Sequence, residues 1–218
     1  MSDLVPPRFL FRFELPIHRL DPPPRIDGDL ADWTDRCRLP ELHKIDGRRT
    51  FADVWLGWHE SGLYLACRVR ARNYPPRCDP QKFWKSDNLR LMTDMRDARD
   101  VRRATRFCQH FYFLPAGGGP DGRAPVAGSH RIERAAAHAP LVPSERIPIA
   151  AGRTPGGGYT LEAHLPADLL VGFNPADNPR IGFFTMVEDS EHGQQYLTVG
   201  DDLSWYYDPS TWATGVLC

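Results

Sequence analysis

Apolar and polar residues alternate along several short segments of the chain, which is the pattern of a β-strand with one buried face. In the first of these segments, residues 8–15, the apolar positions are Phe9, Phe11, Phe13 and Leu15. The charged residues Arg12 and Glu14 stand between the last three of them. We therefore predict a half-buried strand over residues 8–15.

The clearest hairpin candidate covers residues 52–59 and 63–70, where apolar residues alternate in both arms. The short polar link Glu60-Ser61-Gly62 suits a tight turn between them. Further strands are predicted at residues 88–94, 107–114, 158–165 and 181–187, with weaker ones near 130–135, 194–199 and 213–217.

Helical patterns are scarce. No segment keeps a 3.6-residue periodicity, and only residues 31–36 and 166–170 favour a short helix. The 21 prolines and 18 glycines punctuate loops, notably residues 116–128 and 153–158. Many short strands separated by turns predict an all-β fold, a β-sandwich of two antiparallel sheets that is immunoglobulin-like or jelly-roll-like. We expect an N-terminal arm with an extra strand in residues 1–20 and one domain in residues 21–218.

The charge balance argues against a dedicated nucleic-acid binder. Lys plus Arg is 27 and Asp plus Glu is 28, which gives a net charge of −1. A protein that binds nucleic acid usually carries a basic excess. Residues 96–106 are rich in arginine, but acids stand three and four positions away, so we expect a solvated segment whose charges pair with one another.

Cysteine usage and the chain start bear on the compartment. Five cysteines form no CxxC pair and leave one over, which argues against a disulfide framework. The first residues carry Asp3 and two prolines instead of the basic start and apolar core of a signal peptide. No window approaches the roughly 18 apolar residues of a membrane helix. We expect a protein without a membrane segment, in the cytoplasm.

The order of several short motifs is informative. Ile26-Asp27-Gly28 with Trp33 comes first, then Gly62-Leu63-Tyr64-Leu65-Ala66, Phe83-Trp84-Lys85-Ser86-Asp87-Asn88, Ile181-Gly182-Phe183 and Ser204-Trp205-Tyr206-Tyr207-Asp208-Pro209-Ser210. This order resembles the family 9 carbohydrate-binding modules, which belong to a wider group of DOMON-like β-sandwiches. The resemblance covers roughly residues 20–218.

The resemblance implies a non-catalytic domain, of a kind often attached to glycoside hydrolases, that holds a sugar between two tryptophans. The matching residues are Trp84 and Trp205. Flat indole rings can cover the apolar C–H faces of a sugar while nearby polar groups bind its hydroxyls. We interpret the other four tryptophans as packing residues: Trp33, Trp55, Trp58 and Trp212.

Several positions depart from the family pattern. Arg90 stands where the family has a glutamate that binds sugar hydroxyls, and Cys108 and His110 replace an arginine and an asparagine. An acceptor three residues before the second tryptophan is kept as Asp202. We expect Arg90, Gln109, His110 and Asp202 to contact the polar rim of the ligand. Arg90 with Asp202 would equally suit an anionic sugar or a carboxylate.

The resemblance also implies calcium ions that stabilise the fold, although Ala71 replaces an aspartate that lies near a calcium in the family. Two groups of acids supply candidate ligands: Asp87, Asp94, Asp97 and Asp100, and Glu188, Asp189 and Glu191. Apart from calcium, no feature of the sequence requires a cofactor.

Two further readings stay open beside carbohydrate binding. The domain is then either a structural or protein-interaction sandwich that has lost its sugar site, or an enzyme or metal site. The second reading rests on Cys108 and His110, which are two positions apart and so share one face of a strand. A glycosidase would need two facing carboxylates, and nothing in the sequence selects such a pair. Carbohydrate, with no nucleic acid and no membrane, is the expected partner, and a protein partner stays open.

Overall fold

The computed structural model describes residues 7–200 and 203–218. Within them the chain forms eleven strands joined by long loops and short 3-10 turns. The strands are β1 (Glu14–Arg19), β2 (Ala52–His59), β3 (Gly62–Val69), β4 (Asn88–Asp94), β5 (Cys108–Gly118), β6 (Ala124–His130), β7 (Ile149–Arg153), β8 (Tyr159–Pro166), β9 (Arg180–Asp189), β10 (Gly193–Tyr196) and β11 (Ala213–Leu217). The 3-10 helices are η1 (Pro7–Leu10), η2 (Leu30–Asp32), η3 (Asp35–Cys37), η4 (Leu42–Asp46), η5 (Pro80–Lys85), η6 (Ser144–Arg146), η7 (Pro155–Gly157), η8 (Ala167–Leu169) and η9 (Pro209–Thr211).

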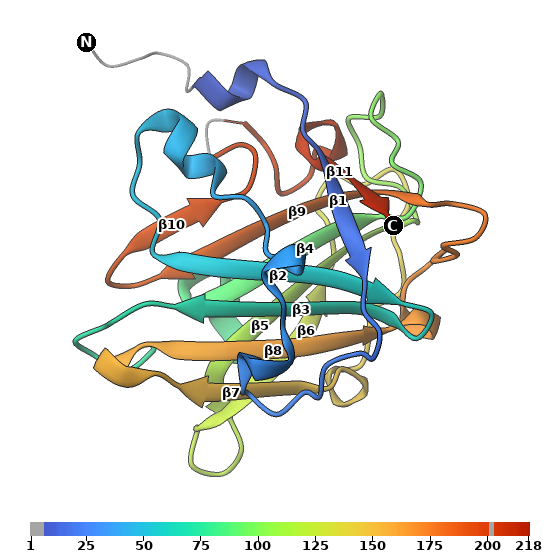
Figure 1. Cartoon of the computed structure of the whole chain (residues 1–218). Coiled ribbons are helices and arrows are strands. Elements are labelled where there is room, and N and C mark those ends of the chain that lie inside the picture. The colour runs from blue at the N-terminus through green and yellow to red at the C-terminus, as the bar shows by residue number, and fades with distance from the viewer. Residues whose placement is uncertain (1–6, 201–202) are drawn as a thin grey trace.

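The all-β prediction is confirmed, but the sheet arrangement is more continuous than predicted. Hydrogen bonds link the strands in the order β6-β5-β4-β9-β11-β1-β2-β3-β8-β7, with β10 beside β9. β1 is parallel to both β11 and β2, whereas the other pairs are antiparallel. The strands lie in two layers, with β2, β3, β8 and β7 in front of β4, β5 and β6 (Figure 1). β1 therefore connects the two layers into one mixed sheet. Its two ends, β6 and β7, approach each other.

The strand predicted over residues 8–15 is wrong in its first half. Residues Pro7–Leu10 form η1, and β1 begins only at Glu14. Arg8 is buried in η1, where its Nε lies 2.7 Å from Asp46 Oδ2 and its Nη1 donates to the Tyr196 carbonyl at 2.9 Å. This buried ion pair, rather than the alternation of phenylalanines, fixes the local backbone.

The predictions also missed two edge strands. β6 lies largely inside the predicted loop 116–128, and β7 was not predicted, while the strand predicted near residues 130–135 does not form. Both edge strands are built mostly from small residues, as in the β6 sequence APVAGSH, so they show no apolar alternation. Neither residues 31–36 nor residues 166–170 form an α-helix, and each contains only short 3-10 turns.

The main core fills the space between the two layers. β2, β3 and β8 contribute one side of it, and β4, β5 and β9 contribute the other. A second cluster covers the outer side of β4 and β9 and includes Phe184, Trp205 and Trp212. A third covers the outer side of β2 and β3 and includes Trp33 and Trp55. Among the described residues, no helix is both long enough and apolar enough to cross a membrane.

The opening motif of the sequence serves the fold. The carboxylate of Glu162, on β8, is completely buried and accepts hydrogen bonds from Gly28 N at 2.6 Å and Trp33 Nε1 at 2.6 Å. Gly28 has a φ of +89°, and a Cβ there would lie 2.8 Å from the Ala151 carbonyl carbon. The motif therefore anchors the segment after β1 to the outside of β8.

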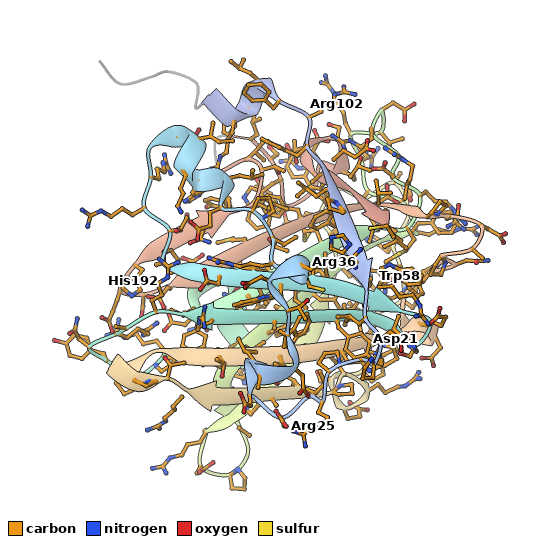
Figure 2. The ribbon with its side chains drawn as sticks, in the orientation of Figure 1. Asp21, Arg25, Arg36, Trp58, Arg102 and His192 are labelled. Carbon is orange, nitrogen blue, oxygen red and sulfur yellow. The ribbon has the colours of Figure 1, made fainter. Side chains whose placement is uncertain are left out.

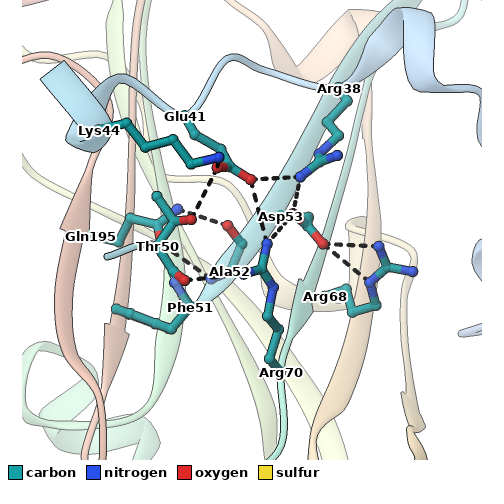
Figure 3. Close-up of polar contacts among 10 residues, drawn as sticks. All are labelled: Arg38, Glu41, Lys44, Thr50, Phe51, Ala52, Asp53, Arg68, Arg70 and Gln195. Carbon is teal, nitrogen blue, oxygen red and sulfur yellow. Dashed lines mark hydrogen bonds and ion pairs between the residues drawn. The ribbon is translucent and has the colours of Figure 1, made fainter. Parts of the chain in front are cut away.

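Polar contacts tie β2 to its surroundings (Figure 3). The buried Asp53 carboxylate forms ion pairs with Arg38, Arg68 and Arg70. Gln195, on β10, accepts from Phe51 N at 2.9 Å and donates to the Ala52 carbonyl at 2.8 Å. An amide side chain therefore continues the hydrogen bonding of β2 toward the β9–β10 hairpin.

Candidate binding cleft

An open cleft of about 550 Å³ lies on the outer side of β4, β5 and β9. It combines exposed aromatic rings with charged and amide side chains. Its lining comprises Phe83, Trp84, Arg90, His110, His130, Arg131, Glu133, Met186, Glu188, Gln194, Trp205 and Tyr206. Four of the six residues predicted to bind a ligand therefore meet in one place.

Trp84 offers a large exposed ring at the cleft. It belongs to η5, whose N-cap Asp79 accepts from Gln81 N, and its side chain is 49% exposed. The preceding Phe83 is buried and stacks on Tyr112 with ring centroids 4.1 Å apart. Trp84 meets the edge of Phe83 at 5.4 Å, so a packed ring supports the exposed one.

Trp205 lines the same cleft but is only 2% exposed. It stacks on Phe184 with centroids 4.9 Å apart and packs against Tyr196. Its neighbour Tyr206 is 42% exposed and meets it edge-on at 5.8 Å. Trp205 therefore forms a floor of the cleft, and the exposed ring on that side belongs to Tyr206, which was not among the predicted ligand contacts.

Arg90 projects from β4 into the cleft, where other groups already hold its guanidinium. Its Nε donates to Asn88 Oδ1 at 3.0 Å and its Nη2 donates to the Trp84 carbonyl at 3.1 Å. Glu188 lies 3.6 Å away, and the guanidinium also sits over the rings of Phe83 and Trp205. The charge of Arg90 is therefore balanced within the cleft, and its side chain helps to fix the backbone of Trp84.

His110 and Gln109 point to opposite faces of β5, as strand geometry requires. His110 is buried at the cleft, and its Nε2 makes no hydrogen bond with any described residue. Burial, and then the charge of Arg90, hold the pKa of His110 well below its usual range, so the ring is neutral. Gln109 lies away from the cleft, donating to the Leu169 carbonyl and accepting from Val171 N. Asp202 lies outside the described residues.

Five other polar residues of the cleft were not predicted as ligand contacts: His130, Arg131, Glu133, Glu188 and Gln194. His130 lies opposite His110 across the β5–β6 ladder, with ring centroids 5.9 Å apart. Glu188 and Gln194 face each other across the β9–β10 hairpin, where Gln194 Nε2 donates to Glu188 Oε2 at 3.0 Å. Only their position in the tertiary structure shows that they share a site with Trp84.

Two of the acids considered as calcium ligands, Asp87 and Asp189, pair with an arginine in this structure. The side chain of Arg72 is completely buried and forms ion pairs with Asp87, at 2.9 Å, and with Asp189. The other Asp87 oxygen accepts from Ser190 N. No group of three or more His, Cys, Asp or Glu residues in the described parts of the chain could hold a metal ion. The Arg72 guanidinium therefore lies between the Asp87 and Asp189 carboxylates.

Cys108 and His110 share a face of β5, as predicted, but the thiol is a poor nucleophile. Cys108 is buried, and burial raises the pKa of its thiol to about 12. A thiolate is the reactive form of cysteine, and little of it exists near neutral pH at such a pKa. The geometry gives no support to chemistry at this residue.

Comparison with solved structures identifies the fold. A family 9 carbohydrate-binding module from Caldicellulosiruptor kristjanssonii, in complex with cellotriose, superposes with a TM-score of 0.62 and 15% identity, covering 94% of this chain and 93% of the module. Its complex with glucose gives a TM-score of 0.61 and 16% identity, covering 95% of this chain and 96% of the module. No protein-family model matches the sequence, and no curated protein matches it. The chain has the fold of a family 9 carbohydrate-binding module.

Proposed function

We propose that this domain binds carbohydrate without catalysis, in the cleft beside Trp84. The observation that carries the proposal is the half-exposed Trp84 ring at the rim of a cleft of about 550 Å³ lined by polar side chains. An indole face suits the apolar C–H face of a sugar, and polar side chains around it suit its hydroxyl groups. The likeness to modules whose structures hold cellotriose and glucose supports the same ligand class.

Each part of the ligand then meets a suitable group. One sugar face stacks on Trp84, and Tyr206 covers the ligand from the Trp205 side of the cleft. Hydroxyl groups reach the Glu188 carboxylate and the Gln194 amide, which both line the cleft. The Nε2 atom of His110 gains a partner from a ligand hydroxyl, which removes the cost of a buried unpaired polar atom.

The first test is a titration of intrinsic fluorescence with glucose and cellotriose. We expect a saturable change with a Kd between about 1 mM and 1 µM, the range of −4 to −8 kcal/mol. Trp84→Ala should abolish the change or weaken binding about five- to tenfold, since stacking contributes about 1–1.5 kcal/mol. The matched control is Tyr74→Ala, because Tyr74 is also exposed, at 71%, and lies outside the cleft.

The main alternative is a protein-interaction domain that has lost its sugar site. The burial of Trp205 favours it, because a second indole face is not exposed. A flat titration with both sugars in the folded wild-type protein would contradict carbohydrate binding at this cleft. That result would favour the interaction domain.

A further inference from the structure

Four arginines form an exposed patch next to the cleft. They are Arg102, Arg103, Arg131 and Arg134, and we call them the arginine patch. They come from two segments of the chain, which a hydrogen bond from Ala136 N to the Ala104 carbonyl holds together at 2.8 Å. Arg103 Nε also donates to the Arg134 carbonyl at 2.8 Å. The patch is therefore a product of the fold and not of one run of sequence.

The arginine patch forms no ion pairs within the part of the chain that the structure describes. Among the described residues, no carboxylate lies within 4.0 Å of any of the four guanidinium groups. The prediction that residues 96–106 pair with one another is wrong for Arg102 and Arg103, since Arg99 alone in that segment pairs, with Asp97 at 4.0 Å. Figure 2 shows Arg102 at the edge of the molecule, away from the strands. A chain of net charge −1 thus concentrates positive charge at one place.

The patch continues directly from the cleft. Arg131 lines the cleft itself. The guanidinium of Arg134 lies over the ring of Tyr207, 5.0 Å from its centroid. Tyr207 in turn meets Tyr206, a cleft residue, with ring centroids 5.0 Å apart. A ligand longer than one sugar that leaves the cleft on the Tyr206 side therefore passes over the arginines.

We propose that the ligand is an acidic oligosaccharide, with one sugar against Trp84 and carboxylate or sulfate groups of its neighbours on the arginine patch. The inference rests on the proposed carbohydrate-binding function and names its ligand class. Guanidinium groups bind carboxylate and sulfate oxygens through paired N–H donors. Inside the cleft, Glu188 lies 3.6 Å from Arg90 and balances its charge, so the anionic groups bind on the arginine patch at the edge of the cleft.

The test compares ligands that differ only in charge. Cellotriose, the same trisaccharide oxidised to glucuronate at C6, and its C6-sulfated form are titrated against the full chain by calorimetry. At low ionic strength we expect the acidic forms to bind roughly three- to tenfold more tightly than cellotriose, the effect of one or two exposed ion pairs. The advantage should disappear at about 0.5 M salt, where screening is strong. The two acidic forms show whether carboxylate or sulfate is preferred.

Charge reversal assigns the effect to the patch. Arg102→Glu/Arg103→Glu should remove the preference for acidic ligands and leave cellotriose affinity unchanged, since neither residue lines the cleft. Arg36→Glu/Arg49→Glu changes the net charge equally, at exposed arginines outside the patch, and should keep the preference. If the double variant unfolds because Arg103 loses its backbone contacts, Arg102→Glu alone should reduce the preference.

The outcomes separate this inference from the proposed function. Equal affinity for acidic and neutral ligands, with binding still lost in Trp84→Ala, overturns the inference and leaves carbohydrate binding intact. No binding of any trisaccharide overturns both. Equal binding of the acidic trisaccharides and a single-stranded DNA oligomer, retained in Trp84→Ala, shows a general polyanion surface and also overturns the inference.

Discussion

At the scale of single residues, His43 is a buried neutral imidazole. It lies in η4, and its Nε2 accepts a hydrogen bond from Tyr196 N at 3.1 Å. Burial, and then the charge of Arg8, lower the pKa of His43 to about 4. An accepting nitrogen must be unprotonated, so this contact agrees with the neutral form.

We expect His43 to make folding stability depend on pH between about 6.5 and about 4. An unfolded histidine has a pKa near 6.5, so the unfolded state binds more protons in this window. The free energy of unfolding should therefore fall as the pH falls, by about 3 kcal/mol from this residue. Urea unfolding from pH 7 to pH 4.5 should show a steeper loss for the wild type than for His43→Gln. The exposed His138, changed to Gln, is the control, and equal slopes for the wild type and His43→Gln would contradict the assignment.

Single residues also show which parts of the cleft could not be predicted from the sequence. Trp84 and Trp205 both have polar neighbours in the chain, and both were expected to hold the sugar. Trp205 is covered by Phe184, on β9, and Tyr196, on β10. The residues next to Trp205 in the sequence do not reveal these contacts. The alternation rule placed Cys108 and His110 correctly, and applied to Gln109 it would have excluded that residue from the cleft.

At the scale of elements, Arg72 connects three segments. It follows β3, and its guanidinium forms ion pairs with Asp87, before β4, and Asp189, at the end of β9. Its Nη2 also donates to Ser190 Oγ at 3.2 Å. A buried cation between two carboxylates holds the β3–β4 connection against the β9–β10 hairpin.

Removing this cation should be strongly destabilising. We expect Arg72→Met to lower the free energy of unfolding by about 3–5 kcal/mol, because it leaves buried carboxylates unpaired. Arg123→Met, which removes an exposed pair with Asp121, should cost less than about 1 kcal/mol. Because Arg72 occupies Asp87 and Asp189, EDTA should leave the wild-type Tm unchanged. Urea unfolding and thermal scans measure both effects, and a Tm that falls in EDTA would show that calcium stabilises the fold after all.

The elements that the sequence predicted are those with apolar alternation. β2, β3, β4, β5, β8 and β9 each present one face to the core, so their patterns are visible in sequence. The edge strands β6 and β7 lack this signal, and residues 16–19 of β1 lie beyond the alternating segment. Pairing with neighbours determines them, and a parallel pairing such as β1 with β2 leaves no mark in the local pattern.

At the scale of the whole molecule, β1 is the strand on which the mixed sheet depends. It lies between β11 and β2 and pairs with both, so it joins the chain's last strand to its first hairpin. Ile17, in its centre, is fully buried in the main core. The predicted boundary at residue 20 would place this strand in an arm outside the domain.

We expect instead that residues 21–218 do not fold cooperatively alone. Their sheet would expose unpaired backbone edges on β11 and β2, and the core would lose Ile17. Circular dichroism with urea should show a broad transition or none, whereas we expect the chain of residues 1–218 to unfold in one step. Ile17→Ala should lower the free energy of unfolding of the full chain by about 2–5 kcal/mol, while Pro16→Ala, at an exposed position of the same strand, should have little effect. If the shortened chain unfolds at the same urea concentration as the full chain, residues 1–20 are a separable arm. The sheet then closes without β1.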